Sequence, residues 1–263
     1  MITGNTRLFA IIADPIAQVR TPEVFNEYFR AQRMDAVLVP IQVAPEGLAD
    51  VVTGLRAMSN LGGFIVTVPH KISVAALCDE LGPTGRATVS VNTVRRTADG
   101  RLIGDMFDGE GFVRGLRGQG NDPAGKRVLL LGSGGAAGAI AFALAQAGTG
   151  SITIANRTRS RAEHVVKRVR EFFPQANIAA GDSDPRGFDI VVNATSLGMK
   201  PTDPLPLDTD KLQSRTLVAE VVMKPELTPL LERARSLGCP IHFGRHMLDE
   251  QARLMAHFML EEA

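Results

Sequence analysis

The sequence predicts an α/β protein of two domains: an N-terminal α/β domain and a Rossmann-type dinucleotide-binding domain. Three observations support this fold class. The chain has 263 residues, a length that suits two compact domains. Short apolar runs alternate with helical patterns along the whole chain, as in sheets whose strands are joined by helices. A glycine-rich segment at 132–138 lies between an apolar run and a helical one.

The N-terminal half is predicted to alternate strands with helices. Its apolar runs predict strands at 8–13, 36–43, 63–68, 89–97 and 101–104. Asp99-Gly100 separates the last two runs and predicts a tight hairpin turn. Apolar spacing predicts helices at 22–32, 48–58 and 108–117, the first of which opens with Pro22. The glycine-rich stretch that follows, 118–123, marks a domain boundary.

The C-terminal half begins a second series of the same kind. Strands are predicted at 127–131, 151–155, 189–192, 217–222 and 240–243. Helices are predicted at 136–147, 161–173, 227–237 and 247–260. The last helix has apolar residues spaced to bury one face, among them Met247, Met255 and Met259.

Composition excludes several classes of protein. The net charge is +1, without the basic excess that binds nucleic acid, and no apolar run is long enough to span a membrane. Cys78 and Cys239 are too few for a disulfide framework or a cysteine-rich metal site. His242 and His246 do not predict a zinc site, because Gly244 separates them and no third ligand is evident. We therefore expect a soluble, cytoplasmic protein without a metal.

Residues 127–138 form a dinucleotide-binding fingerprint between a strand and a helix. Gly132 permits the tight turn, and Gly134 lets the backbone approach a pyrophosphate, which the helix N-terminus then faces. Either Ala137 or Gly138 lets the helix pack on the strand. A simple strand–turn–helix is the alternative, but a further strand about twenty residues on favours cofactor binding.

The end of that further strand predicts which dinucleotide binds. A carboxylate is expected there when a ribose 2′-hydroxyl is bound, but residues 156–161 read Asn-Arg-Thr-Arg-Ser-Arg. Guanidinium groups suit a 2′-phosphate, so Arg157 and Arg161 favour NADP, with NAD as the alternative. The other basic residues here are interpreted as a solvated helix face: Arg159, Lys167, Arg168 and Arg170.

Three polar residues of the first half have both a structural and a functional interpretation. Lys71 follows a strand and a proline, yet by spacing alone it is an ordinary surface lysine. Asp108 opens a predicted helix, where aspartate is a common N-cap. Asn92 ends a strand, where asparagine also serves turns. Spacing and pattern leave these alternatives open.

Taken together, the segments resemble the shikimate dehydrogenase family, which includes quinate/shikimate and aminoshikimate dehydrogenases. The resemblance covers nearly the whole chain. The matching segments are Val66-Thr67-Val68-Pro69-His70-Lys71, Val91-Asn92-Thr93, Gly104-Asp105 with Asp108-Gly109, residues 132–138, Asn156-Arg157-Thr158 with Arg161, residues 193–199, Thr228-Pro229-Leu230-Leu231, and Met247 with Gln251.

The resemblance implies the site residues and the domain roles. It makes Lys71 and Asp108 a catalytic pair that lies close together, and it implies no metal. The substrate-binding residues that it implies are Thr21, Thr67, Asn92 and Gln251. The cofactor-binding residues are Gly132, Gly134, Gly135, Ala136, Asn156, Arg157, Thr158, Arg161, Asn193, Ala194, Thr195, Val221, Gly244 and Met247. Residues 1–107 with 245–263 would form the substrate-binding catalytic domain, to which the C-terminal helix returns, and 108–244 the NADP-binding domain.

Departures from the family pattern gather where the substrate carboxylate is held. The family carries a histidine, two serines, an asparagine, an asparagine-threonine pair and a tyrosine, at positions that here are Gln18, Val19, Thr21, Ile65, Met106, Phe107 and Met223. These replacements make the carboxylate pocket more apolar. A site that loses hydrogen bonds to a substrate group discriminates less well for it, so shikimate should bind poorly or the specificity should shift.

The sequence is therefore interpreted as an NADP-dependent dehydrogenase acting reversibly on a cyclic hydroxy acid of the shikimate/3-dehydroshikimate type, as in aromatic amino acid biosynthesis. One alternative is a paralogue that acts on quinate or a related cyclic polyol, with NADP or NAD. An alternative from another class is a non-catalytic NADP-binding regulatory module, which the intact Lys71 and Asp108 argue against. The expected partner is a small-molecule substrate, not nucleic acid or membrane, and the expected state is monomer or homodimer.

Overall fold

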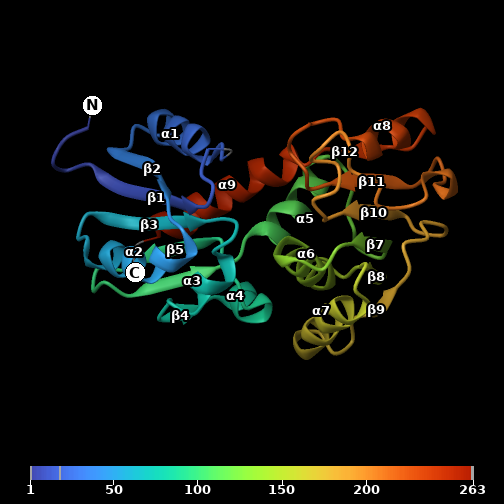
Figure 1. Ribbon diagram of the computed structural model, residues 1–263, viewed down its shortest axis with the longest axis horizontal. Helices are drawn as coiled ribbons and strands as arrows, with labels where there is room; N and C mark the ends of the chain where they lie inside the picture. Colours follow the sequence, from blue (N-terminus) through green and yellow to red (C-terminus); the bar gives the residue numbers. More distant parts are fainter. Residues whose placement is uncertain (1, 18, 262–263) are drawn as a thin grey trace. The chain divides into compact units, whose positions relative to one another are not determined.

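The structure, a computed structural model, describes residues 2–17 and 19–261 (Figure 1). The chain divides into two compact units: unit 1 consists of Met1–Phe107 with Ala252–Ala263, and unit 2 of Asp108–Gln251. Each unit contains a six-stranded sheet, which confirms the α/β fold class. The C-terminal segment returns to unit 1 from Ala252 onward, whereas the prediction assigned residues from 245 to that domain. Among the described residues, no helix has both the length and the apolar character needed to cross a membrane.

Unit 1 holds a mixed sheet with strand order β2-β1-β3-β5-β6-β4. Its strands are β1 (Arg7–Ala13), β2 (Ala36–Gln42), β3 (Leu61–Val66), β4 (Glu80–Leu81), β5 (Thr93–Arg96) and β6 (Leu102–Asp105). Its helices are α1 (Thr21–Ala31), α2 (Leu48–Ala57), α3 (Lys71–Ala75) and α4 (Pro83–Thr88), with a short 3₁₀ turn, η1 (Pro45–Gly47). β1 pairs in parallel with β2 and β3, whereas β5 is antiparallel to β3 and β6 because the predicted hairpin joins β5 to β6.

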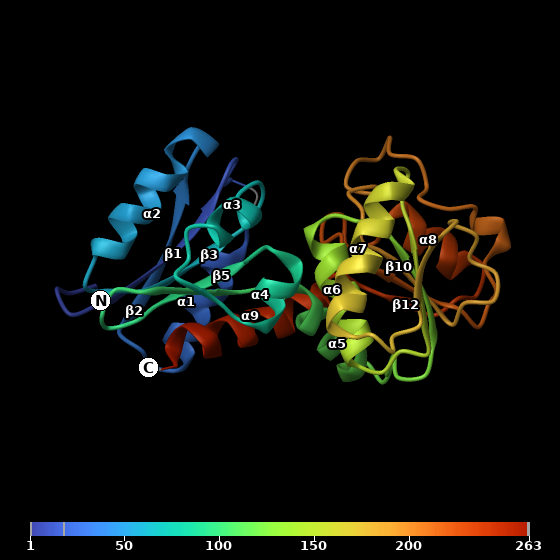
Figure 2. The ribbon, with the colours of Figure 1, turned by 90° about the horizontal axis from the view of Figure 1, so that it is seen from below.

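Helices cover both faces of this sheet (Figures 1 and 2). Alternate residues of a strand point to opposite faces, so β1 and β3 each contribute to two apolar clusters. One cluster packs Phe64 and Val66 against α2 and α3. The other packs Ile65 against α1 and the end of α9 (Arg245–Leu260). Residues of β3 that share the face of Ile65 therefore lie on the α1 side of the sheet.

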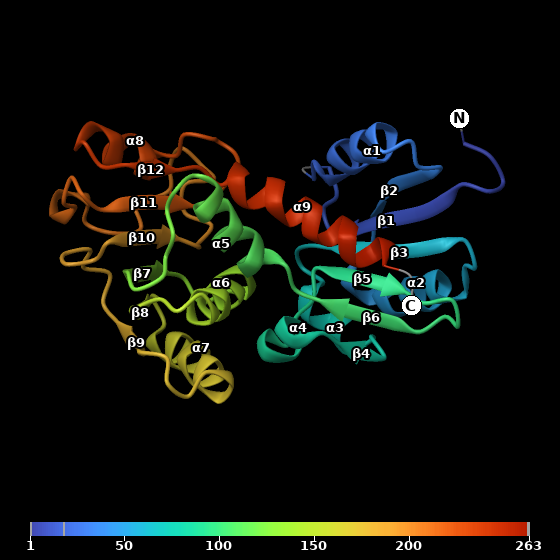
Figure 3. The ribbon, with the colours of Figure 1, turned by 180° about the vertical axis from the view of Figure 1, so that it is seen from behind.

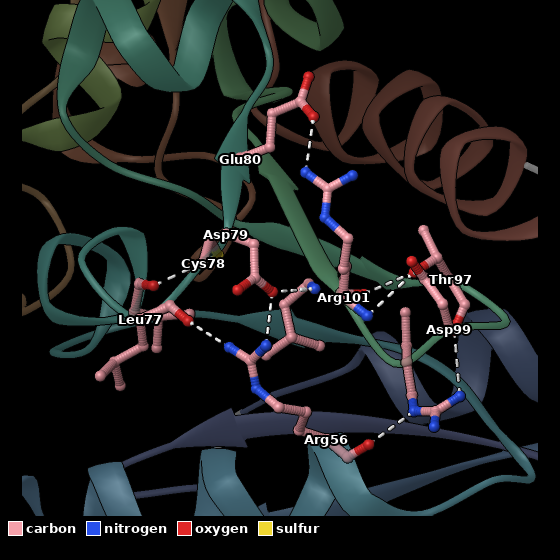
Figure 4. A network of polar contacts seen from close by, with 11 residues as sticks. Arg56, Leu77, Cys78, Asp79, Glu80, Thr97, Asp99 and Arg101 are labelled. Carbon is pink, nitrogen blue, oxygen red and sulfur yellow. Dashed lines mark hydrogen bonds and ion pairs between the residues drawn. The ribbon is translucent and has the colours of Figure 1, made fainter.

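A polar network secures the edge strand β4 (Figure 4). The Asp79 carboxylate accepts hydrogen bonds from the Arg56 guanidinium (2.5 Å) and the Leu102 backbone amide (2.6 Å). These bonds, the one from Leu102 first, lower the pKa of Asp79. Arg56 also donates to the Leu77 carbonyl, while Arg101 donates to Glu80. A two-residue strand can form few backbone hydrogen bonds with its neighbour, so these side-chain bonds help to hold β4 beside β6.

Unit 2 holds a parallel sheet with strand order β12-β11-β10-β7-β8-β9. Its strands are β7 (Arg127–Leu131), β8 (Ser151–Ala155), β9 (Ile178–Gly181), β10 (Ile190–Asn193), β11 (Leu217–Glu220) and β12 (Ile241–His242). Its helices are α5 (Asp108–Gly118), α6 (Gly135–Gln146), α7 (Arg159–Phe172), α8 (Pro229–Ser236) and the start of α9, with a 3₁₀ turn, η2 (Thr209–Lys211). Numbered within the unit, the order is 6-5-4-1-2-3, that of a dinucleotide-binding Rossmann sheet.

Both faces of the second sheet are also covered (Figure 3). The cluster on one face packs strand residues against α5, α6 and α7, and the cluster on the other packs them against α8. Glycines let α5 approach its neighbours closely. A Cβ at Gly109 would lie 2.0 Å from the Ala139 carbonyl oxygen of α6, and one at Gly115 2.8 Å from the His246 carbonyl oxygen. No side chain fits at those two contacts.

The predicted bounds differ from the structure mainly at strand ends. β3 ends at Val66, not at 68. β5 begins at Thr93, not at 89, because Val89 has a φ of 50° where α4 ends. β11 ends at Glu220, not at 222. The short elements α3, α4, β4 and β9 were not predicted.

His242 is a buried titratable group in unit 2. It is 1% exposed, and its ring lies 6.0 Å from that of Phe112 and 4.9 Å from that of His246. Burial, followed by the nearby His246, lowers the pKa of His242 to about 4. The folded protein therefore resists protonation of His242 at pH values where an unfolded histidine is already charged.

We predict that His242 makes the protein less stable as the pH falls. Between pH 7 and 5 the unfolded chain binds a proton at an ordinary histidine pKa near 6.5 and the folded chain does not. The unfolded state is thus favoured by about 2 kcal/mol at pH 5 relative to pH 7. In urea unfolding, His242→Phe should lose that share of the pH dependence, while the exposed-site control His164→Gln should keep it. Equal pH slopes in wild type and His242→Phe would contradict the prediction.

Candidate active site

The loop after β7 has the turn that the glycine fingerprint predicts. Gly132 has a φ of 113°, a conformation that residues with a side chain rarely adopt. Its amide donates to the Ala155 carbonyl at 2.8 Å. A Cβ on Gly132 would lie 2.8 Å from the Ala194 carbonyl oxygen, so the loops after β7 and β10 touch through this glycine.

The start of α6 leaves its backbone amides open. Gly134 is the N-cap residue and offers no side-chain cap, and a Cβ at Gly134 or Gly135 would meet no atom within 4 Å. Between the two predicted candidates for helix packing, Ala137 takes the role because it is fully buried, while Gly138 faces open space. Uncapped amides at a helix N-terminus, with room beside them, fit the pyrophosphate of a dinucleotide.

The segment after β8 presents basic side chains. Asn156 donates to the Thr158 carbonyl at 2.9 Å, and Thr158 begins α7 without a side-chain cap. Arg157 and Arg161 are exposed, and their guanidinium groups form no hydrogen bond or ion pair with any residue that the structure describes. The three arginines interpreted as part of a helix face do have partners: Arg159 with Glu163, Arg168 with Glu171, and Arg170 with the Ile178 carbonyl. Their pairing distinguishes them from the two arginines predicted to bind phosphate.

The ends of β10 and β11 bring three further predicted cofactor residues together. Asn193 is fully buried, and its side-chain oxygen accepts from the amide of Thr195 at 3.1 Å. Its carbonyl accepts from the Val221 amide at 3.2 Å. Glu220, also fully buried, accepts from the Asn193 side chain at 3.0 Å. Sequence reasoning missed Glu220, because it stands inside an apolar run predicted as strand.

Two more predicted cofactor residues lie near the start of α9. A Cβ at Gly244 would be 2.5 Å from the Val222 carbonyl oxygen, so glycine is required for the turn to approach the end of β11. Met247 is 8% exposed and packs in the same apolar cluster as Phe112 and Ile140. Its core role is therefore seen directly, whereas its contact with a cofactor stays a prediction.

Asp108 and Gln251 form a pair within unit 2. Asp108 is the first residue of α5 and is 2% exposed. Its Oδ1 accepts a hydrogen bond from Gln251 Nε2 at 2.5 Å. A buried carboxylate needs hydrogen-bond donors, and an amide supplies one without neutralising its charge. The predicted pairing of Asp108 with Lys71 joins residues of different units and stays a prediction.

In unit 1, Lys71 begins α3 after a turn tied to three strands. Lys71 is half-buried, and its carbonyl accepts from the Val91 amide at 2.9 Å. Thr67 donates its amide to Ile12 of β1, and the buried His70 contacts the Val43 carbonyl at 2.7 Å. These bonds set the backbone of the lysine segment at the carboxyl ends of β1, β2 and β3.

Asn92 is held between the lysine segment and the start of α5. It is 1% exposed, its carbonyl accepts from the Val66 amide at 2.7 Å, and its amide donates to the Asp105 carbonyl at 3.0 Å. Its side-chain oxygen accepts from the Phe107 amide at 3.0 Å. The Phe107 bond thus settles which end of the Asn92 amide is the acceptor and which is the donor.

Three of the positions that depart from the family pattern, Val19, Ile65 and Phe107, lie in apolar surroundings. Ile65 is 4% exposed in the cluster that α1 and α9 cover, and both Val19 and Phe107 pack against that cluster. Thr21, half-buried, is the first residue of α1. In unit 2, Met223 is 48% exposed. Gln18 lies outside the described residues.

Among the described residues, neither the two cysteines nor a group of metal ligands forms a second reactive centre. Both thiols are free, and burial raises the pKa of Cys78 to about 12 and also raises that of Cys239. Within the described ranges, no three His, Cys, Asp or Glu residues are grouped to hold a metal ion. The thiols are therefore poor nucleophiles at neutral pH.

Comparison with known proteins finds matches along most of the chain. Residues 11–94 match the family model "Shikimate dehydrogenase substrate binding domain", and residues 117–199 match "Shikimate / quinate 5-dehydrogenase". A shikimate dehydrogenase (NADP(+)) of Rubrobacter xylanophilus is 40% identical over 254 residues, covering 94% of this chain and 88% of the relative.

Solved structures agree with these matches. The ligand-free 5-ketofructose reductase of a Gluconobacter strain is 35% identical with a TM-score of 0.90, covering 98% of this chain and 94% of that one. Shikimate 5-dehydrogenase of Listeria monocytogenes, in complex with shikimate and NAD, is 34% identical with a TM-score of 0.90, covering 99% and 94%.

The loop after β7 yields a prediction about two glycines. Gly132→Ala would place a Cβ against the Ala194 carbonyl in a backbone conformation that disfavours alanine, whereas Gly138→Ala adds a Cβ in open space. We expect Gly132→Ala to weaken NADPH binding by about tenfold or more, since a displacement of roughly 1 Å in a site can cost that much. Gly138→Ala should bind as wild type does. Fluorescence titration with NADPH measures both, and equal dissociation constants for the two variants would contradict the geometry.

Proposed function

The chain belongs to the shikimate dehydrogenase family, and on that premise we propose that it transfers a hydride reversibly between NADP and the CH–OH carbon of a cyclic hydroxy acid of the shikimate type. It is an NADP-dependent oxidoreductase. The observation that carries the proposed reaction is that Lys71 and Asp108 are both present in the segments that match the family. A non-catalytic regulatory module would need neither residue.

The cofactor-binding residues of unit 2 suit NADP. The open amides at Gly134 and Gly135 would receive the pyrophosphate, and the unpartnered guanidinium groups of Arg157 and Arg161 would receive the 2′-phosphate. NADP held by these residues would supply the hydride acceptor for the alcohol, and NADPH the hydride donor for the ketone. We propose that the enzyme works in the cytoplasm on a small molecule, as a monomer or homodimer, which light scattering of the purified protein would decide.

Lys71 and Asp108 have complementary tasks in the proposed mechanism. When the alcohol is oxidised, the hydroxyl proton leaves to Lys71, and when the ketone is reduced, the lysine ammonium returns a proton and stabilises the alkoxide charge. Asp108 accepts a hydrogen bond from the substrate hydroxyl and orients it. Gln251 holds the Asp108 carboxylate in place, while Asn92 and Thr67 bind ring hydroxyls.

We predict that Lys71 and Asp108 function as one unit. Lys71→Ala and Asp108→Ala should each reduce kcat by about 10²-fold or more, because proton transfer is lost. The double variant should be little worse than the poorer single one, since residues that act together are not additive. NADP reduction by the purified variants measures this. Near-wild-type turnover of Lys71→Ala, or additive losses in the double variant, would contradict the mechanism.

We predict that Arg157 selects NADP over NAD. A charge-assisted hydrogen bond contributes about 1.5–3 kcal/mol, so Arg157→Ala should weaken NADP use by roughly 10- to 150-fold and leave NAD kinetics nearly unchanged. Arg159→Ala is the matched control, because Arg159 is paired with Glu163 and should not affect either cofactor. A wild-type protein that binds NAD as tightly as NADP would contradict the assignment.

A second candidate substrate is a neutral cyclic polyol or its ketone. The burial of Ile65 in an apolar cluster, with Val19 and Phe107 packed against it, favours this candidate, because these positions offer no donor for a carboxylate. The similarity to a 5-ketofructose reductase supports it as well. Parallel assays separate the candidates: NADP reduction with shikimate, quinate, aminoshikimate and neutral cyclic polyols, and NADPH oxidation with 5-ketofructose.

We predict that shikimate is oxidised with a poor kcat/KM that a restored hydroxyl improves. Each lost hydrogen bond to a carboxylate is worth about 1.5–3 kcal/mol, so Val19→Ser should raise kcat/KM for shikimate by about tenfold or more. Adding Met223→Tyr should raise it further. Val24→Ser is the control, because Val24 is an exposed residue of α1. A low-micromolar KM for shikimate in the wild type would show that the pocket is not impaired.

A further inference from the structure

A buried polar cluster lies at the carboxyl ends of β10 and β11, and the mechanism above does not use it. Its members, Asn193, Glu220 and Thr228, are all 0% exposed. Burial raises the pKa of the Glu220 carboxyl, while hydrogen bonds from Asn193 and Thr228 lower it. Within the described part of the chain, Glu220 has no ion-pair partner. A buried carboxyl group without a cation is costly, so hydrogen bonds must hold it.

Four hydrogen bonds surround the Glu220 carboxyl group. Asn193 Nδ2 donates to Oε1 at 3.0 Å and to Oε2 at 3.1 Å. Thr228 Oγ1 donates to Oε1 at 2.8 Å, and the Val222 amide to Oε2 at 3.4 Å. Glu220 thereby fixes the donor end of the Asn193 side-chain amide, and the oxygen end of that amide must face the other way.

The oxygen end of the Asn193 amide organises the loop that follows β10. Asn193 Oδ1 accepts from the Thr195 amide at 3.1 Å and from Thr195 Oγ1 at 2.7 Å. The same Thr195 hydroxyl accepts from the Leu197 amide at 3.0 Å, and Asn193 Nδ2 donates to the Leu197 carbonyl at 2.9 Å. The backbone of residues 194–197 is thus wrapped around the Asn193 side chain, and outside this loop Glu220 is the residue that binds the donor end of its amide.

This loop lies at the place where the second sheet reverses its strand order. β7 is followed outward by β8 and β9 on one side and by β10, β11 and β12 on the other. In sheets of this kind, ligands bind outside the carboxyl ends of the strands at that reversal. The loop after β7 contributes Gly132 and the loop after β10 contributes Ala194, whose amide donates to the Leu131 carbonyl at 2.9 Å. The two loops therefore border the same ligand site.

We propose that Glu220 is a positioning residue for the dinucleotide: through the Asn193 amide it holds residues 194–197 against Gly132 in the conformation that receives the cofactor. The proposal rests on the proposed function for the identity of the cofactor. Glu220 itself touches no ligand in this role. Its loss removes two of the three acceptor contacts of Asn193 Nδ2 and leaves only the Leu197 carbonyl, which weakens the hold on the Asn193 oxygen that the Thr195 amide and hydroxyl share.

Three variants test this role. Glu220→Ala removes all four acceptor contacts, while Glu220→Gln keeps the shape and one oxygen that can still accept from Asn193. Thr216→Val is the matched control: Thr216 is also 0% exposed and immediately precedes β11, but its hydroxyl donates to the Phe188 carbonyl at 3.0 Å, at the opposite end of the strand. For each protein, fluorescence titration gives the Kd for NADPH, steady-state assays give KM for NADP and for the alcohol, and thermal unfolding gives Tm.

Glu220→Ala should raise the Kd for NADPH and the KM for NADP by about tenfold or more, as expected when a binding loop shifts by roughly 1 Å. The KM for the alcohol should stay near that of the wild type. Glu220→Gln should recover most of the lost affinity, because it can again orient Asn193. Thr216→Val should lower Tm and leave the Kd unchanged, since it removes a buried hydrogen bond far from the loop.

The opposite pattern would overturn the inference. If the Glu220 variants lower Tm as Thr216→Val does but bind NADPH within about twofold of the wild type, a difference below roughly 0.5 kcal/mol, Glu220 only stabilises the fold. If Glu220→Ala does not fold, Asn193→Ala decides instead, because it removes the amide through which Glu220 acts. An NADPH Kd of Asn193→Ala within about twofold of the wild type would reject the role. A wild type that binds NADPH but oxidises no alcohol refutes the proposed reaction and leaves the Kd comparison intact. A wild type that does not bind NADPH refutes both.

Discussion

The register of the central strands in the second sheet is the constraint on which the cofactor half depends. β10 pairs in parallel with both neighbours, so that Asn193 lies beside Leu131 on one side and Glu220 on the other. Parallel strands end at one edge, and the backbone groups beyond that edge have no ladder partner. Beyond these strand ends, the Gly132 amide donates to the Ala155 carbonyl, while the side chains of Asn193 and Glu220 accept from the amides of Thr195 and Val222. The same bonds give the two loops fixed shapes beside the uncapped start of α6.

In the first sheet, too, the backbone groups beyond the strand ends need hydrogen-bond partners outside the strand pairing. Its residues after the strand ends carry the proposed proton-transfer and substrate-binding groups, and backbone bonds hold them: Thr67 to Ile12, and Asn92 to Val66 and Asp105. Because β5 runs antiparallel to β3, Asn92 stands at the start of one strand beside the end of the other. One residue therefore links the lysine segment to the chain that leads into α5. Asp108 then begins α5 with its carboxylate already bound by Gln251.

Much of this organisation could be predicted from the sequence, because it depends on local patterns. Apolar runs and Asp99-Gly100 suffice for the main strands and the hairpin. The glycine fingerprint suffices to predict the turn at Gly132, because glycine alone adopts a positive φ without steric cost. Lys71 and Asp108 required resemblance to a family, since spacing alone does not distinguish a catalytic lysine from a surface one. Glu220 could not be predicted, because its partner Asn193 is 27 residues away and its apolar neighbours Ala219 and Val221 make it look like part of an apolar strand. β4 and β9 were missed because the few residues of each show no periodicity.

Hydrogen exchange of the wild-type protein, with and without saturating NADPH and read by mass spectrometry, tests most directly whether the dinucleotide binds at the strand reversal of the second sheet. We expect NADPH to slow exchange in two segments distant in sequence, 132–138 and 194–198, because both border that site. The groove beside α7 and β9, lined by residues such as Arg159 and Lys167, should be unaffected. Protection confined to that groove, or absent from 194–198 while NADPH is bound, would contradict the assignment.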